Sequence, residues 1–167
     1  MSLFARWPQP VLRRPAVPVA AVDAQVTAIW DEMLAAMYAT PGIVGLAAPQ
    51  LGHGVRLAVL DCSERRDAPV RLADPELVRA SDETARRAEG SPHLPGLMAE
   101  IERPAEVRVR FLDETGRETE RDFDGLWAAA VQHQIDHLEG RMFFDRLSRM
   151  RRQRLLAAHA KRGRRGR

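Results

Sequence analysis

His133-Gln134-Ile135-Asp136-His137 is the stretch that decides the fold and the chemistry of this chain. Residues four apart lie on one face of a helix, so His133 and His137 can offer two imidazole nitrogens to one metal ion. This is the spacing of a metalloprotease-type HExxH helix, except that Gln134 takes the place of the glutamate. That glutamate normally takes a proton from metal-bound water and hands it to the leaving group, which an uncharged amide cannot do. The stretch predicts a hydrolase site without its base.

Length and composition are those of an ordinary soluble protein. The chain has 167 residues, of which 45% are hydrophobic and 29% charged, and we expect one domain over residues 1–167. No segment approaches the roughly 18 to 20 apolar residues that span a bilayer, and the N-terminus has no signal-peptide run. We therefore expect a cytoplasmic protein with no membrane partner. Cys62 is the single cysteine, which excludes an intrachain disulfide, and we expect it to be a small packing residue.

The charge of the chain is unevenly distributed. Residues 146–167 contain ten Lys or Arg and no Asp or Glu, whereas the first 145 residues carry 16 basic and 23 acidic groups. The sequence predicts an acidic body with a basic C-terminal helix and tail from about residue 146. Arg and Lys bind phosphates without regard to sequence, so RNA or the ribosome is one candidate partner of this tail. The alternative is a solvated helix with a frayed end.

The remaining pattern alternates between helix and strand signals. The first twenty residues hold four prolines and predict an irregular, extended lead-in. Apolar spacing predicts a helix that Asp23 caps, a helix over 125–138 that Asp124 caps and Gly140 ends, and an amphipathic helix after Asp145. Period-two patterns and turn residues predict a buried strand over 55–60 and an antiparallel pair over 107–112 and 117–123. The last helix is expected to pack through Leu147, Met150, Leu155 and Leu156.

Three separated segments resemble the peptide deformylase family. They are Val44-Gly45-Leu46-Ala47-Ala48-Pro49-Gln50, Glu89-Gly90-Ser91-Pro92-His93-Leu94-Pro95-Gly96, and the histidine helix that ends in Leu138-Glu139-Gly140. The resemblance implies an α+β fold, with antiparallel sheets around a central helix that bears the histidines and with helices at both termini. It also implies the ancestral reaction, which is metal-assisted removal of the N-formyl group from the first methionine of nascent peptides.

The resemblance also assigns metal ligands. Family members bind the metal through His133, His137 and a cysteine whose position is Ser91 here. A neutral hydroxyl is a far poorer ligand than a thiolate, so binding of iron, zinc or nickel is expected to be weak or absent. His93 is a possible surrogate ligand, because residues two apart in an extended segment point the same way. The alternative is an ordinary polar residue at the mouth of a pocket.

The resemblance assigns the groups that contact the substrate as well. Gln50 occupies the position whose amide polarises the formyl oxygen, and Gly45 and Val44 lie where the main chain approaches the substrate. The position whose backbone N–H stabilises the oxyanion is Pro92, and proline has no N–H. With Gln134 at the position of the base, the ligand, the oxyanion donor and the proton carrier are all altered.

Three functions follow from this reading. The first is a deformylase-like protein that is inactive or strongly impaired and still binds a formyl-methionyl or N-terminal methionine peptide. The second is an active metallohydrolase with altered ligands, acting slowly on formyl peptides or on another small amide. The third is a ribosome- or RNA-associated role of the basic C-terminal helix, which is compatible with the first.

Overall fold

The computed structural model describes the backbone of residues 3–165 and the side chains of residues 3–161. After the N-terminal segment, which contains one 3-10 turn, η1 (Pro10–Arg13), the first long helix is α1 (Ala24–Ala39). The Asp23 carboxylate accepts a hydrogen bond from the backbone N–H of Val26 at 2.9 Å, so the predicted cap is confirmed. The apolar stripe of α1 is buried as its spacing predicts, including Trp30, Met33 and Met37.

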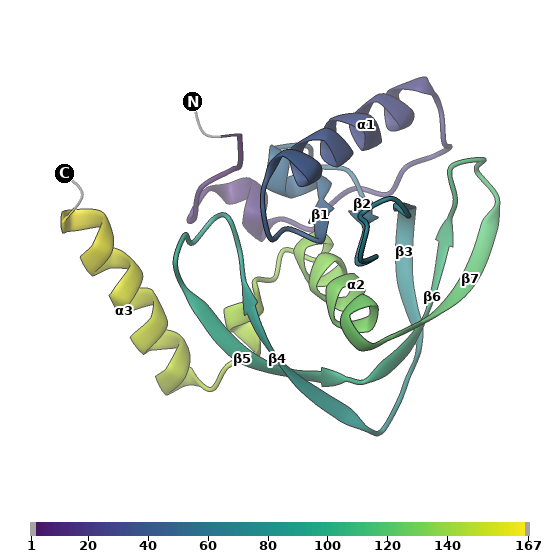
Figure 1. The fold of residues 1–167 in the computed structure, drawn as a ribbon. Helices are drawn as coiled ribbons and strands as arrows, with labels where there is room; N and C mark the ends of the chain where they lie inside the picture. Colours follow the sequence, from purple (N-terminus) through teal and green to yellow (C-terminus); the bar gives the residue numbers. More distant parts are fainter. Residues whose placement is uncertain (1–2, 166–167) are drawn as a thin grey trace.

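The main sheet has five strands in the order β1-β2-β3-β6-β7, and all neighbouring pairs are antiparallel. The strands are β1 (Gly45–Ala47), β2 (Leu57–Leu60), β3 (Val70–Ala80), β6 (Glu106–Leu112) and β7 (Glu118–Asp124). Alternation along β2 divides the core, because Leu57 and Val59 pack with α1 whereas Ala58 and Leu60 pack with the second long helix. The sheet thus has a helix on each face at this end (Figure 1).

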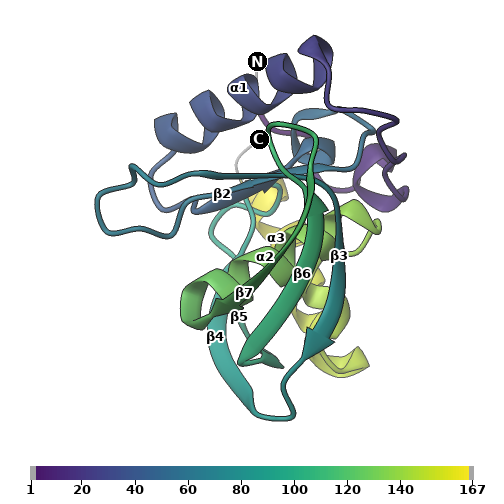
Figure 2. The same cartoon turned by 90° about the vertical axis from the view of Figure 1, so that its right-hand side faces the viewer.

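The second long helix, α2 (Gly125–Leu138), carries the histidines and lies at the centre of the fold. Figure 2 shows α1 running above the sheet while α2 passes beside β6 and β7. The apolar side of α2 packs on the sheet through Ala128, Val131, Ile135 and Leu138. Gly140, with a φ of 72°, ends the run as the spacing predicts. A Cβ at Gly140 would lie 2.6 Å from the backbone oxygen of Arg13, so the chain also approaches too closely there for a side chain.

A two-stranded sheet covers the other side of α2. Its strands are β4 (Thr84–Gly90) and β5 (Met98–Pro104), which pair antiparallel along their whole length. The chain then passes through the 3-10 turn η3 (Phe143–Arg146) to helix α3 (Arg149–Arg165), which lies at the edge of the molecule in Figure 1. The predicted α+β architecture, with antiparallel sheets around a central histidine-bearing helix and helices near both termini, is confirmed.

Several local predictions were wrong in detail. Asp124 precedes α2 as predicted, but its side chain makes no capping hydrogen bond. The proline-rich lead-in includes a helical turn at η1, and the strand predicted from residue 55 begins at Leu57. Met150 is 60% exposed rather than packed, whereas Leu147, Leu155 and Leu156 contact the core. Helix α3 extends to Arg165, the alternative of a solvated helix with a frayed end stays a prediction, and residues 166–167 lie outside the described part. No described helix is long and apolar enough to cross a bilayer.

Candidate functional site

The two histidines of α2 face one another, as their spacing predicts. His133 Nε2 and His137 Nε2 are 3.1 Å apart, and His137 is fully buried. The pKa of His137 is held well below its ordinary value, first because burial disfavours the charged ring and then because positive charge on His133 would repel it. His137 is therefore neutral at physiological pH, with a lone pair available for a metal ion or a hydrogen bond.

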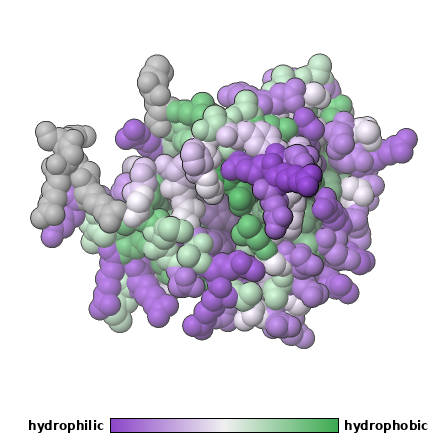
Figure 3. Space-filling view, viewed as in Figure 1, coloured by the Kyte–Doolittle hydropathy of each residue, from purple (hydrophilic) through white to green (hydrophobic). Residues whose placement is uncertain are grey.

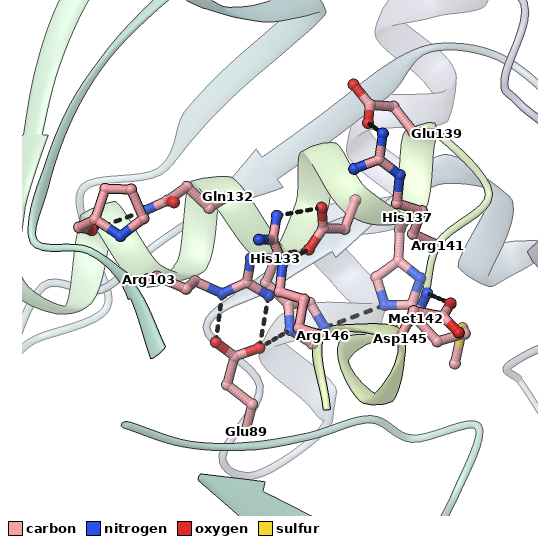
Figure 4. A network of polar contacts seen from close by, with 12 residues as sticks. Glu89, Arg103, Gln132, His133, His137, Glu139, Arg141, Met142, Asp145 and Arg146 are labelled. Atoms are coloured by element: carbon pink, nitrogen blue, oxygen red, sulfur yellow. Dashed lines mark hydrogen bonds and ion pairs between the residues drawn. The ribbon is translucent and has the colours of Figure 1, made fainter. Parts of the chain in front are cut away.

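The outer nitrogen of His133 is held by an acidic side chain from β4. Glu89 Oε2 lies 2.7 Å from His133 Nδ1, and Figure 4 shows Glu89 placed between His133 and Arg103. Burial alone would raise the pKa of Glu89, but hydrogen bonds from Arg103 and His133 lower it to about 2. Glu89 is thus a buried carboxylate that fixes the orientation of the His133 ring, the arrangement expected for the second shell of a metal-binding histidine.

Arg103 from β5 connects this carboxylate to a second one. Its guanidinium donates two hydrogen bonds to Glu89, at 2.5 and 2.8 Å, and a third to Asp136 Oδ2 at 2.8 Å. Asp136 also accepts two hydrogen bonds from Arg146, at 2.6 and 2.7 Å. Burial opposes the charge of Asp136, and the two arginines outweigh it and lower its pKa. Asp136 thus bonds two arginines rather than an imidazole. We call these four charged residues and His133 the buried ion network, because its centre, formed by Glu89, Arg103 and Asp136, is buried, whereas Arg146 reaches it from the surface.

Sequence reasoning did not find Arg103. It lies 14 residues beyond Glu89, on a strand that the sequence did not predict. The two residues meet only because β4 and β5 pair antiparallel, and no local spacing signals that register. Ile101 and Arg103 are two residues apart and so point to the same face of β5, but this places the arginine on the buried face only once the strand is known.

A pocket of about 640 Å³ lies along α2, and its lining includes Gly45 and Ser91. The loop between α1 and β1, the end of β4 with the segment after it, and the first three turns of α2 form its walls. On the face seen in Figure 3, hydrophobic surface gathers near the middle and is bordered by hydrophilic side chains. The pocket brings together seven predicted site residues, namely Val44, Gly45, Gln50, Ser91, Pro92, His133 and Gln134.

The three altered positions all line this pocket. Ser91 and Gln134 are buried. Pro92 lies in the connection between β4 and β5 and has no backbone N–H to donate. Gln134 Oε1 is fully buried and accepts no hydrogen bond from the described residues. Gly45 approaches this amide so closely that a Cβ there would lie 3.1 Å from Gln134 Nε2. The pocket therefore holds uncharged groups at the positions where the resemblance implies a thiolate and a carboxylate.

His93 lies behind the pocket rather than at its mouth, so that alternative interpretation was wrong. Its side chain is 1% exposed, its Nε2 lies 3.0 Å from Gln50 Nε2, and its Nδ1 faces the backbone oxygen of Ala5. Burial lowers the pKa of His93 to about 4, although the Ala5 carbonyl raises it, so the ring is neutral. Both ring nitrogens have partners in this arrangement, and a role of His93 as a ligand stays a prediction.

The donor atoms present do not make up a complete metal site. The histidine pair and the Glu89 contact suit a cation, because two nitrogens 3.1 Å apart can bind one ion at about 2.0 to 2.1 Å each. However, no group of three or more His, Cys, Asp or Glu in the described residues is arranged to hold a metal. His137 Nδ1 is buried and has no hydrogen-bond partner in the described part of the chain, although a metal-bound imidazole needs an acceptor for that N–H. The remaining candidate, Ser91, supplies only a neutral hydroxyl.

Cys62 does not contribute to the site. It is half-buried beside β2, packs against the core that α2 and the sheet share, and lies outside the pocket. Burial and the neighbouring Asp61 raise its pKa to about 12, so it remains a protonated thiol. The prediction that it is a packing residue is confirmed.

Comparisons with known proteins agree with the geometry. The family model described as polypeptide deformylase matches residues 1–153. A peptide deformylase of Methylocella silvestris is 46% identical over 89% of this chain and 78% of its own length. A protein of Brucella melitensis named peptide deformylase-like is 40% identical over 96% of this chain and 97% of its own. The crystal structure of the Ehrlichia chaffeensis peptide deformylase in complex with actinonin has a TM-score of 0.88 at 30% identity, covering 97% of this chain and 98% of that one.

Proposed function

The chain belongs to the peptide deformylase family, and on that premise we propose that it binds the formyl-methionyl end of peptides in its pocket while hydrolysing them poorly or not at all. Family membership supplies the substrate class, and the family is metal-dependent. The substitutions at Ser91, Pro92 and Gln134 supply the impairment.

One observation carries this proposal. The pocket of about 640 Å³ still reaches the histidine helix, with small and apolar side chains along α2. However, Ser91 and Gln134 are uncharged and Pro92 lacks a backbone N–H. A pocket lined mainly by apolar groups with few polar ones is suited to binding a small hydrophobic end group. Recognition and chemistry use different residues here, so one can persist without the other.

The size of the expected impairment follows from general catalysis. Loss of a general base costs about 100- to 10,000-fold in rate. Loss of one oxyanion donor costs roughly 100- to 1,000-fold. These factors act on one transition state and do not simply multiply. Either one alone is enough to separate this chain from an efficient deformylase.

A second candidate is an active metallohydrolase with altered ligands. It is supported by the convergence of the two Nε2 atoms at 3.1 Å and by the Glu89 contact that orients His133. When bound, a metal ion would supply a polarised water in this position. Gln134 lies where that water would be deprotonated, and its amide cannot accept the proton. This candidate therefore ranks below the first.

A third role, on RNA or the ribosome, is compatible with either. Helix α3 exposes Arg149, Arg151 and Arg154, and the sequence holds no acidic residue from 146 onward. Each phosphate contact adds to the salt dependence of binding. Affinity for ribosomes that falls steeply with salt would support this role, and no binding at low salt would exclude it.

The test of the leading proposal measures binding and turnover together. A formyl-methionyl tripeptide is titrated into the protein by calorimetry, and formate release is followed in the same preparation. We expect binding without formate release above background. Ala129→Phe is the control, because Ala129 lines the pocket from α2 and a phenyl ring there fills it. Binding that persists in this variant, or rapid formate release that this variant abolishes, would overturn the proposal.

A further inference from the structure

The side chains of His93 and Gln50 form a buried polar pair beside the pocket. His93 is 1% exposed and Gln50 is also 1% exposed, and their closest side-chain nitrogens are 3.0 Å apart. Two nitrogens this close make a hydrogen bond only if one donates and the other accepts. The neighbouring contacts decide which is which.

The orientation of the Gln50 amide is set by β1. Gln50 Oε1 accepts a hydrogen bond from the backbone N–H of Ala47 at 2.8 Å, so its oxygen points to Ala47 and its nitrogen to His93. An amide nitrogen only donates. His93 Nε2 must therefore accept, which leaves the proton of the neutral ring on Nδ1. That N–H faces the backbone oxygen of Ala5, which accepts it. This single assignment gives each of the three contacts, to Ala47, between the two side chains and to Ala5, one donor and one acceptor.

One donor is left over. The Gln50 amide nitrogen carries two hydrogens, and His93 is its only partner among the described residues. Gln50 also lines the pocket. The sequence predicted two donors to the formyl oxygen, the backbone N–H at position 92 and the Gln50 amide. Because Pro92 has no N–H, the second hydrogen of the Gln50 amide is the one that remains of these two.

We propose that His93 is a positioning residue that fixes the Gln50 amide, directs its second N–H into the pocket, and so makes the pocket select peptides with a small N-acyl group, such as formyl, over the same peptides with a free amino terminus. A formyl oxygen accepts this N–H, whereas an ammonium group would place one donor against another. The inference rests on the proposed binding function and adds the residue that gives it selectivity.

The test replaces His93 with glutamine and with asparagine, whose amide groups occupy the positions of the ring nitrogens Nε2 and Nδ1, respectively. In His93→Gln the terminal amide group sits where Nε2 was, so its oxygen accepts from Gln50. In His93→Asn the amide nitrogen sits where Nδ1 was, so it keeps the Ala5 contact and loses the Gln50 contact. Affinities are measured by calorimetry for a formyl-methionyl tripeptide and for the same tripeptide without the formyl group. Affinity for the unformylated peptide reports whether each variant keeps the pocket.

We expect wild type and His93→Gln to prefer the formyl peptide by about three- to ten-fold, the worth of one net hydrogen bond. We expect His93→Asn to lose this preference without a change in affinity for the unformylated peptide. A preference that survives in His93→Asn, or one that is absent from wild type, overturns the inference. If wild type binds neither peptide, the proposed function fails, and the inference falls with it.

Nitrogen NMR of the histidine rings gives a readout that does not need a ligand or a variant. The assignment requires His93 in the wild-type protein to be neutral with its proton on Nδ1. A proton on Nε2 would leave the Gln50 nitrogen facing another donor and would overturn the inference whatever the peptides do.

Discussion

The two sides of helix α2 differ in how completely their polar groups are satisfied. On one side, Glu89, Arg103, Asp136 and Arg146 form the buried ion network, in which each charge has an opposite partner at 2.5 to 2.8 Å. On the pocket side, Gln134 Oε1 is buried without a donor among the described residues, and Ser91 and Pro92 stand where the family resemblance implies a thiolate and a backbone donor. The helix thus has one fully paired side and one side with an unpaired group.

This difference separates what supports the fold from what supports chemistry. Removing one member of a buried ion network leaves an uncompensated charge, so it costs folding free energy whether or not the protein is an enzyme. Ser91, Pro92 and Gln134 are uncharged and line a cavity, so they can vary without loss of the fold. A chain whose reaction is no longer needed is therefore expected to change on the pocket side first. Four predictions test whether the two sides are as independent as this implies.

The largest expected effect is on the pocket side. The triple variant Ser91→Cys, Pro92→Leu, Gln134→Glu returns the thiolate, the backbone N–H and the base together. We expect formate release to rise by about 1,000-fold or more, because the base and the oxyanion donor are each worth at least about 100-fold. Formate release from a formyl-methionyl peptide, with iron, nickel or zinc supplied, measures this.

The control for the triple variant is the same protein with His137→Ala, which removes a ligand and exposes any contaminating host enzyme. Elemental analysis should give about one metal equivalent for the triple variant and much less for wild type, since a thiolate replaces a hydroxyl. Unchanged activity in a variant that holds its metal would mean that the pocket has altered beyond these three positions.

The next largest effect is on the network side. Arg103→Met leaves the buried carboxylates of Glu89 and Asp136 without their shared partner, so we expect a loss of about 3 to 5 kcal/mol in the free energy of unfolding. Arg108→Met is the matched control, because Arg108 pairs with Asp122 on the exposed face of the sheet, where solvent screens the pair and its loss should cost far less. Urea unfolding measures both. Equal losses would show that the network contributes no more than a surface pair.

Acid provides a second test of the network side, because it removes the charge of Glu89. The pKa of Glu89 is about 2 in the folded protein against an ordinary 4.5, so the unfolded chain binds the proton first as pH falls. Its contribution to stability is complete above pH 4.5 and is lost as pH falls from 4.5 toward 2, on the order of 3 kcal/mol in total. We expect Glu89→Gln to be less stable than wild type at pH 6 and to have a flatter dependence below pH 4.5. Parallel curves for the two proteins would contradict this.

The sequence predicted most of the fold that surrounds α2. Local signals placed α1, α2, α3, β2 and the β6–β7 pair, because apolar periodicity and caps act within a few residues. Strands β1, β3, β4 and β5 were missed. Much of β3 and β4 is exposed and rich in charged residues, so neither shows the alternation that marks a half-buried strand. Their pairing depends on contacts with distant segments, which local patterns do not encode.

The sequence also predicted the pocket side of the site better than the network side. Ser91, Pro92, Gln134 and Gln50 were found through the order of three motifs, and the pocket brings them together. Arg103 and the Gln50 contact of His93 were not found. They depend on the register of β4 with β5 and on the path of the chain around Ala5, which brings together residues far apart in sequence.

The smallest effect distinguishes two glutamines on the same helix. Gln132 Nε2 donates to the backbone oxygens of Pro104 and Ala128, at 3.0 and 2.9 Å, whereas Gln134 Oε1 accepts from no group within residues 3–161. Methionine has a similar length and no hydrogen-bonding amide. We expect Gln132→Met to lose about 1 to 2 kcal/mol, because it leaves the Pro104 carbonyl without its donor, and Gln134→Met to be neutral or to gain up to about 1 kcal/mol. Urea unfolding of both variants measures this. If Gln134→Met destabilises the protein as much as Gln132→Met does, the Gln134 amide is satisfied in solution, and the pocket side is as fully paired as the network side.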